Sequence, residues 1–230
     1  MSHKWIDELP SKRLIAEFSV WSADLARLHD DLQRVEPYVD VLHIDVADGH
    51  FAPAMLFFPD LVAAVRKVSK KPIHVHLMVA DAILLSQIDQ FCDVGTDLIS
   101  IHLENLAVAE EALALLEKRN VAIGMVLKVE TPVEDVKPFV SQLCFLTLLG
   151  TAIGVKGQGL NEQATTRLGV AQKMIAGAGT KHRIVLAADG GIREHTVPLL
   201  RGAGAETVVL GSLAFGAPDL SARMNWLHGL

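Results

Sequence analysis

The feature that most constrains the fold of this chain is a regular alternation of short apolar runs with longer amphipathic segments. The apolar runs predict eight strands, at residues 14–19, 41–46, 73–78, 98–102, 122–127, 145–149, 184–187 and 207–210. Segments with helical periodicity follow them, for example at 23–36, 59–70, 110–119 and 165–179. Strands that alternate with helices form a parallel sheet, and eight such units close into a barrel. We therefore predict an α/β fold, a (β/α)₈ TIM barrel.

The first amphipathic segment, residues 23–36, shows the helical pattern well. Its apolar residues recur at the helical period and are expected on one face, with charges on the other: Leu25, Leu28, Leu32 and Val35. The alternative fold is a doubly wound open sheet, but the GxGxxG motif that such sheets often carry after the first strand is absent.

The chain shows no division into separate folding units. No Pro-, Gly- or Ser-rich linker interrupts its 230 residues, half of which are hydrophobic and can form a sizeable core. We predict one barrel domain over residues 1–230. Residues 1–13 form an N-terminal extension that covers the bottom of the barrel or a neighbouring subunit.

Charge and hydropathy exclude several functional classes. The formal net charge of −6 argues against a nucleic-acid-binding surface, which needs clustered Lys and Arg. No run reaches the roughly 18 apolar residues of a membrane span, and the N-terminus MSHKWIDELPSKRL lacks an apolar signal core. Cys92 and Cys144 lie far apart without CxxC spacing and are interpreted as buried thiols. The chain is expected to be cytoplasmic.

Polar side chains collect at the carboxyl ends of the predicted strands, where barrels of this type carry their chemistry. They are Ser19 on strand 1, His43 and Asp45 on strand 2, His74 and His76 on strand 3, His102 on strand 4 and Asp189 just past strand 7. Residues two apart on a strand point the same way. Two imidazoles and two carboxylates from strands 2, 3 and 7 therefore predict a divalent metal site. Taken singly, His74 and His102 are interpreted as hydrogen-bonded core residues.

Glycines follow the last three predicted strands. They occur in residues 154–159, 189–191 and 210–212. Glycine lets backbone N–H groups approach a phosphate closely, and barrels commonly bind phosphate in their last loops. These loops therefore predict a phosphorylated ligand.

Five segments, in this order and spacing, resemble the ribulose-phosphate 3-epimerase family: SVWSADLARL, HIDVADGHF, HVHLMV, AADGGI and LGSLAFGAPD. The resemblance runs from Phe18 to Asp219. It implies a ribulose-phosphate-binding (β/α)₈ barrel of carbohydrate metabolism that inverts C3 of ketose phosphates such as ribulose 5-phosphate. It also implies one bound divalent metal ion (Zn, Fe, Mn or Co) and a homo-oligomeric assembly.

The resemblance assigns roles position by position. The metal ligands would be His43, Asp45, His76 and Asp189. Asp45 and Asp189 would also be the catalytic acid and base, one on each face of the substrate, with charge on the enediolate stabilised by the metal. The substrate-binding residues would be Ser19, His76, Met78, Gly157, Gly190, Gly191, Gly211 and Ser212, of which the glycines and Ser212 hold the phosphate.

Several positions depart from the family's pattern. The family typically has Met at positions 47 and 149, Asp at 74 and Glu at 187, whereas this chain has Ala47, Leu149, His74 and Ala187. The loop after strand 6 becomes AIGVKGQ, with Lys156, and strand 1 leads into Trp21. Our hypothesis is that the proton-transfer groups are kept while the sugar pocket is rebuilt for another ketose phosphate, such as a tetrulose or hexulose phosphate. His74 either replaces a lost hydrogen-bond partner or only packs.

Three alternatives compete with this interpretation. Phosphate-binding lyases of the orotidine phosphate decarboxylase or hexulose phosphate synthase type use Asp-x-Lys-x-x-Asp, and here the corresponding stretch HIDVADGHF contains no lysine. A catalytically silent sugar-phosphate binder is conceivable because of the lost carboxylates, although it would not need the full set of ligands. A purely structural subunit has no support in the sequence. Phe57, Phe58 and Trp226 lie either at interfaces or in the barrel packing.

Overall fold

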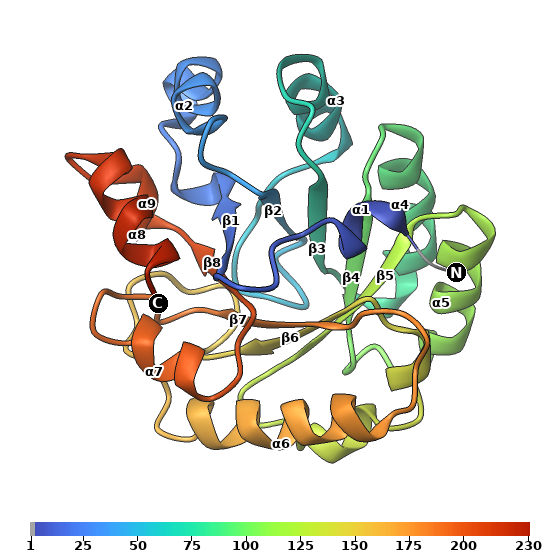
Figure 1. Ribbon diagram of the computed structural model, residues 1–230. Helices are drawn as coiled ribbons and strands as arrows, with labels where there is room; N and C mark the ends of the chain where they lie inside the picture. The colour runs from blue at the N-terminus through green and yellow to red at the C-terminus, as the bar shows by residue number, and fades with distance from the viewer. Residues whose placement is uncertain (1–2) are drawn as a thin grey trace.

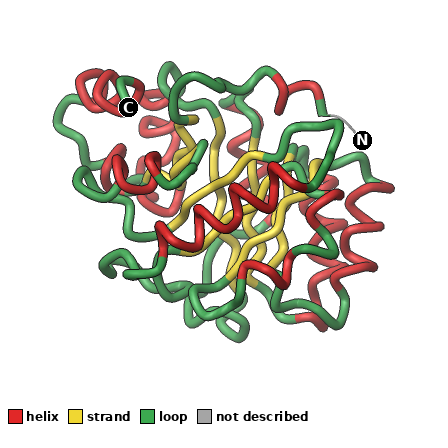
Figure 2. The backbone as a smooth tube through the Cα atoms, turned by 60° about the horizontal axis from the view of Figure 1, so that its bottom comes forward, coloured by secondary structure: helices red, strands yellow, loops and turns green. Residues whose placement is uncertain are grey.

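The computed structural model describes residues 3–230, so residues 1–2 of the predicted extension lie outside the described residues. Eight parallel strands form a closed barrel in chain order (Figures 1 and 2). They are β1 (Ile15–Ser19), β2 (Val41–Ala47), β3 (Ile73–Met78), β4 (Leu98–His102), β5 (Ala122–Leu127), β6 (Phe145–Leu149), β7 (Val185–Asp189) and β8 (Thr207–Leu210). Because β8 pairs in parallel with β1, the barrel is predicted correctly and the open-sheet alternative is wrong.

Helices surround the barrel (Figure 2). They are α1 (Lys4–Asp7), α2 (Leu28–Val35), α3 (Pro59–Val68), α4 (Asp81–Asp93), α5 (Ala109–Lys118), α6 (Ala164–Gly177), α7 (Val197–Gly202), α8 (Ser212–Phe215) and α9 (Leu220–His228). Short 3₁₀ turns occur at η1 (Val20–Ser22), η2 (Leu25–Arg27), η3 (Val133–Val136) and η4 (Val140–Gln142). None of the helices formed by residues 3–230 is long and apolar enough to cross a membrane.

Two features of this ring differ from the prediction. After β5 the connection is made by η3 and η4 in place of a helix, since Pro132 and Pro138 interrupt the segment and cannot donate a backbone hydrogen bond. Residues 25–27 form a separate 3₁₀ turn, begun by the Asp24 side chain, which accepts from the Ala26 N–H. Leu25 is consequently out of phase with α2 and 54% exposed, so its predicted place on the buried face is wrong.

Strand β7 extends further than expected. Its pairing with β6 continues to Leu149 opposite Asp189, so Asp189 is the last residue of the strand and does not lie beyond it. The Gly150 N–H donates to the Asp189 carbonyl at 2.6 Å, which extends the pairing past the end of β6. The carboxylate is thereby held by a strand, which fixes its direction better than a loop would.

The lower end of the barrel is apolar and is closed by the N-terminal segment. Ile6 and Leu9 pack there against buried residues of six strands. The Trp5 ring lies 6.4 Å from the ring of Phe145 in a stacked arrangement. Figure 1 shows α1 in front of this end of the barrel. The extension therefore covers the bottom, the first of the two predicted positions.

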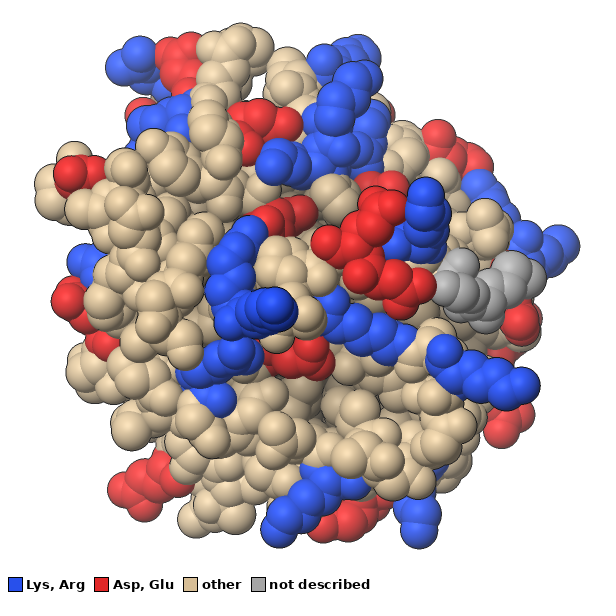
Figure 3. All heavy atoms as spheres, in the orientation of Figure 1, with Lys and Arg blue, Asp and Glu red and all other residues tan. Residues whose placement is uncertain are grey.

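Above this apolar end lies a layer of buried polar side chains, hereafter the polar layer: Glu17, His43, His74, Ser100, Thr147 and Thr207. Gly124 of β5 makes room for it, because a Cβ at Gly124 would stand 1.9 Å from the Ser100 hydroxyl oxygen. Outside the barrel, basic and acidic side chains are interspersed on the face in Figure 3.

Candidate active site and metal centre

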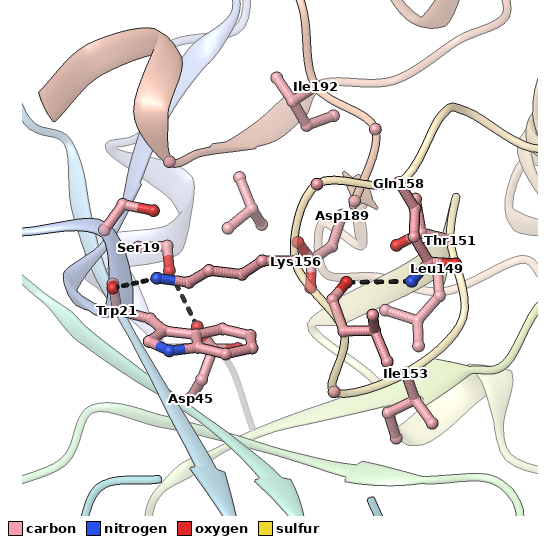
Figure 4. A pocket seen from close by; sticks show the side chains of 18 of the residues that line it. Ser19, Trp21, Asp45, Leu149, Thr151, Ile153, Lys156, Gln158, Asp189 and Ile192 are labelled. Carbon is pink, nitrogen blue, oxygen red and sulfur yellow. Dashed lines mark hydrogen bonds between the residues drawn. The ribbon is translucent and has the colours of Figure 1, made fainter. Parts of the chain in front are cut away.

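A pocket of about 420 Å³ opens at the carboxyl ends of the strands. All eight residues predicted to bind substrate line it: Ser19, His76, Met78, Gly157, Gly190, Gly191, Gly211 and Ser212. Asp45 and Asp189 lie at its floor, and His43 lies beneath them, fully buried. Figure 4 shows Asp189 near the loop that follows β6 and Asp45 on the other side of the pocket, next to Ser19 and Trp21. The structure therefore brings every predicted site residue to one end of the barrel.

The four predicted metal ligands form one cluster. His43, Asp45, His76 and Asp189 each offer a ligand atom, and these atoms all lie within 4.8 Å of one another. The Asp45 Oδ1 lies 3.1 Å from His43 Nε2 and 3.3 Å from His76 Nδ1, while Asp189 Oδ2 lies 3.9 Å from His76 Nδ1. Two imidazole nitrogens and two carboxylate oxygens are a donor set that Zn²⁺ and related divalent ions accept.

Strand geometry explains this convergence. His43 and Asp45 are two apart on β2, so both side chains point into the barrel. His76 stands directly opposite Asp45 in the β2–β3 pairing, and Asp189 arrives from β7 across the barrel. The Ser19 hydroxyl of β1 donates to Asp45 Oδ2 at 2.8 Å, which ties a pocket residue to the cluster.

The two aspartates differ in their electrostatic surroundings. Burial raises the pKa of Asp189 to about 6, and the nearby Asp45 carboxylate adds to the rise although His43 and His76 oppose it. Burial also works to raise the pKa of Asp45, but its contacts with His43 and His76 outweigh it and hold that pKa well below the usual value. At a pH where Asp45 is ionised, Asp189 thus still readily carries a proton, and an acid–base pair requires such a difference.

Each histidine of the cluster has its second ring nitrogen engaged by another group. His43 Nδ1 lies 2.7 Å from Glu17 Oε1. His76 Nε2 lies 2.8 Å from His102 Nε2, and His102 Nδ1 lies 2.9 Å from Glu104 Oε2. Burial lowers the pKa of His102 to about 4, so its neutral ring donates to Glu104 and accepts from His76. These contacts leave His43 Nε2 and His76 Nδ1 directed at the two aspartates.

Glu17 and Glu104 were missed by reasoning from the sequence. Glu17 interrupts an otherwise apolar run and has the same parity as Ser19, a signal that could have identified it as inward-facing. Glu104 lies two residues beyond the end of β4 and gave no comparable signal. His74 and His102 are hydrogen-bonded core residues, as interpreted from the sequence.

The glycines of the phosphate loops meet specific backbone requirements. Gly157, Gly190 and Gly191 have φ values of +82°, +86° and +69°, a region that side chains disfavour. A Cβ at Gly190 would also lie 2.2 Å from the Thr151 hydroxyl oxygen. Close packing between the β6 and β7 loops therefore demands glycine there.

The loop after β6 reaches across the pocket mouth. Its Lys156 Nζ donates to the Trp21 carbonyl at 2.6 Å and lies 4.5 Å from the centre of the Trp21 ring (Figure 4). Both residues line the pocket. Partial burial lowers the pKa of Lys156, although the Asp45 charge opposes this. The ammonium group therefore faces the pocket, in a loop where the family resemblance breaks down.

Comparison with known proteins agrees with this geometry. A sequence profile described as the ribulose-phosphate 3 epimerase family matches residues 15–215. The ribulose-phosphate 3-epimerase of Bacillus subtilis (strain 168) is 32% identical over 212 residues, which are 92% of this chain and 96% of that protein. The chain belongs to the ribulose-phosphate 3-epimerase family. As a member it is an epimerase, an isomerase that acts on carbohydrates. The ribulose-phosphate 3-epimerase of Synechocystis sp. is 31% identical over 91% of this chain and 90% of its own length.

Solved structures show how widely this barrel is shared beyond the epimerase family. The tryptophan synthase A-subunit of Pyrococcus furiosus matches with a TM-score of 0.69 at 17% identity, covering 96% of this chain and all of its own. The orotidine 5'-phosphate decarboxylase of Pyrococcus horikoshii matches with a TM-score of 0.67 at 12% identity, over 94% of this chain and all of its own. At such identities the likeness concerns the fold alone.

Proposed function

We propose that this chain is a metal-dependent epimerase that inverts C3 of a ketose phosphate, either ribulose 5-phosphate and xylulose 5-phosphate or a related tetrulose or hexulose phosphate. The observation that carries the proposal is the pair Asp45 and Asp189, which share a buried cluster with two imidazoles while differing in their affinity for a proton. Membership of the epimerase family argues against the alternatives of a silent binder and a lyase.

The residues of the cluster fit a divalent metal ion. His43, Asp45, His76 and Asp189 would hold it, because their four donor atoms are close enough to share one ion. When bound, such an ion stabilises negative charge that develops on substrate oxygens, which makes the weakly acidic proton next to a carbonyl easier to remove. The donor set is compatible with Zn, Fe, Mn or Co and does not choose among them.

The chain's own groups supply the proton transfers. Inversion requires removal of the C3 proton on one face and return of a proton on the other, so two acid–base groups are needed. Asp45 and Asp189 approach from β2 and β7, on opposite sides of the barrel axis. Asp45, held ionised, takes the proton from one epimer, while Asp189, with its raised pKa, supplies a proton on the other face. Ser19 orients Asp45 through its hydroxyl.

The sugar phosphate would span the pocket from this cluster to the glycine loops. Gly157, Gly190, Gly191, Gly211 and Ser212 line the end of the pocket proposed for the phosphate. Lys156 adds a cation at the mouth, and Ala47 and Leu149 stand where the family typically has Met. These differences support a substrate other than the pentulose phosphates, since they change the bulk and charge that a sugar chain meets.

The proposed reaction is tested by solvent exchange. Metal-loaded protein is incubated in D₂O with tetrulose, pentulose and hexulose phosphates, and deuterium at C3 and the epimer ratio are followed by NMR. An epimerase places deuterium at C3 of both epimers, and the sugar that reacts fastest is the substrate. Exchange with none of the sugars by a metal-loaded protein would overturn the proposal. Fastest turnover of ribulose 5-phosphate would overturn the altered specificity alone.

Asp45→Asn and Asp189→Asn separate the two proton-transfer roles. Each variant should lose epimerisation by about 10²–10⁴-fold, the range that one general acid or base contributes. Because each keeps one carboxylate, each should retain exchange at C3 of one epimer, and the two variants should favour opposite epimers. Loss of exchange with both epimers in both variants would contradict the assignment of one carboxylate to each face.

Lys156→Ala tests the rebuilt loop. If the ammonium group contacts the substrate, its loss should raise KM for the best substrate about 10–100-fold, as expected for a hydrogen bond from a charged group. Lys128→Ala is the matched control, because Lys128 Nζ also lies over an aromatic ring, Phe51 at 3.9 Å, but Lys128 does not line the pocket. Equal KM values for both variants would show that Lys156 only closes the loop against Trp21.

A further inference from the structure

We infer that Glu17 is a positioning residue for the proposed metal centre, which fixes the tautomer and orientation of His43 from the neighbouring strand. The inference rests on the proposed metal site and goes beyond it, since Glu17 lies outside the set of four ligands and cannot contact substrate. Its side chain is fully buried in the polar layer, below the pocket floor.

The contacts of Glu17 are few and specific. Its Oε1 lies 2.7 Å from His43 Nδ1 and 2.5 Å from His74 Nδ1. The Thr207 hydroxyl, 3.3 Å away, donates to Oε2. The carboxylate is therefore held between three side chains from β2, β3 and β8, and its direction is set by the barrel.

These contacts determine which nitrogen of His43 is available. A carboxylate only accepts hydrogen bonds, so the nitrogen facing it carries the proton. His43 therefore carries a proton on Nδ1, held by Glu17. Its Nε2, 3.1 Å from Asp45 Oδ1, also faces a carboxylate and is the nitrogen that would bind an ion taking the place of this hydrogen bond. A carboxylate behind a metal-bound imidazole also raises its basicity and restrains its rotation. Glu17 thus prepares His43 to ligate through Nε2 before any ion arrives.

His74 is held by the same arrangement. Its Nδ1 donates to Glu17, and its Nε2, 2.6 Å from the Ser100 hydroxyl, accepts from that group. His74 stands opposite His43 in the β2–β3 pairing, at the position where the resemblance implied an aspartate. The carboxylate behind His43 therefore comes from β1 in this chain, on the other flank of β2, and His74 restrains it. This contact favours the first interpretation of His74, a replacement hydrogen-bond partner.

The test measures metal binding and the geometry around the ion. Glu17→Gln keeps the shape of the side chain and removes its charge. Its affinity for Zn²⁺, measured by competition with a chelator, should fall about 10–100-fold, and the visible absorption bands of the Co²⁺-loaded protein should shift. Thr147→Val is the matched control. Thr147 Oγ1 lies in the same layer without a hydrogen-bond partner among the described residues, so this variant should bind both ions as the wild type does.

A second measurement needs no variant and remains decisive if Glu17→Gln does not fold. Histidine NMR of the Zn²⁺-loaded wild type should show the His43 proton on Nδ1 and the metal-shifted resonance at Nε2. The opposite tautomer would overturn the inference, as would a Glu17→Gln protein with unchanged affinity and Co²⁺ spectrum. A wild type that binds neither ion would instead overturn the proposed metal site, so the two failures are distinguishable.

Discussion

At the residue scale, the pocket holds two aspartates whose pKa values are shifted in opposite directions. Asp45 faces two imidazoles and a serine hydroxyl, whereas Asp189 lies among buried surroundings and close to the Asp45 charge. The surroundings of each carboxylate thus favour the ionised form of Asp45 and the protonated form of Asp189.

The raised pKa of Asp189 predicts how the stability of the metal-free protein depends on pH. The folded value of about 6 exceeds the ordinary value of 3.8, so folding favours the protonated form. The stabilisation is complete below pH 3.8 and is lost as the pH rises through 6. Urea unfolding should therefore show the wild type losing on the order of 2 kcal/mol relative to Asp189→Asn between pH 4 and 6. A constant difference across that interval would contradict the raised pKa.

The residues of the cluster could be grouped from the sequence because strand parity is a strict rule. His43 and Asp45, or His74 and His76, must share a face if the strand exists. Parity also applies to Glu17, but one carboxylate in an apolar run does not reveal its partners. The link from Glu17 to His43 depends on the register between β1 and β2, which a single sequence does not contain.

At the element scale, the inward-facing side chains of the strands form layers along the barrel. The lower end is apolar, the polar layer lies above it, and the pocket lies at the carboxyl ends of the strands. Seven of the eight predicted strands agree with the structure to within one residue at each end, and the one exception is informative. β7 was predicted to end before Asp189 because a charged residue followed by two glycines resembles a turn. The pairing with β6 carries the strand through it. Tertiary pairing decided a boundary that local composition could not.

Two glycines show that the effect of adding a side chain on stability differs between a position inside the barrel and one on a helix. Gly124→Ala would bring a methyl group against the Ser100 hydroxyl in the polar layer, and we expect a loss of about 1–3 kcal/mol of unfolding free energy. Gly169→Ala in α6 meets nothing within 4 Å and should stabilise the protein by about 0.5–1 kcal/mol. Chemical denaturation of both variants measures this contrast.

Ser100→Ala provides the control for the clash in the barrel. In the double variant with Gly124→Ala the oxygen that would collide is gone, so much of the loss should be recovered relative to the sum of the single variants. If the losses in unfolding free energy are additive, the destabilisation by Gly124→Ala does not come from a clash with the Ser100 hydroxyl.

At the scale of the whole molecule, stability and chemistry lie at opposite ends of the barrel. The N-terminal segment closes the apolar end, and the pocket opens at the other, with the polar layer between them. The closed barrel followed from the alternating pattern along the whole chain, but the place of the extension did not, because nothing in residues 1–13 specifies which surface they cover. The cytoplasmic location and the homo-oligomeric state stay predictions. Phe58, one of the residues named as a possible interface residue, is exposed.

This separation predicts that the lower end can be weakened without harming catalysis. Ile6 is 2% exposed and packs under the barrel, so Ile6→Ala should lower the unfolding free energy by about 2–4 kcal/mol. kcat/KM for the best ketose phosphate, measured well below the unfolding temperature, should stay within about twofold of the wild type. A large fall in kcat/KM of the folded variant would mean that the polar layer transmits changes from one end to the other.

The contact between Lys156 and Trp21 has an optical consequence. Indole fluorescence is sensitive to a nearby charge, and the chain has three tryptophans, of which Trp5 lies at the closed end and Trp226 in α9. Replacing Trp5 and Trp226 by Phe would leave one emitter, situated at the pocket mouth. Its emission would change whenever the lysine moves away from the ring. Trp21 fluorescence would therefore be an intrinsic probe of the rates at which ligands bind and dissociate.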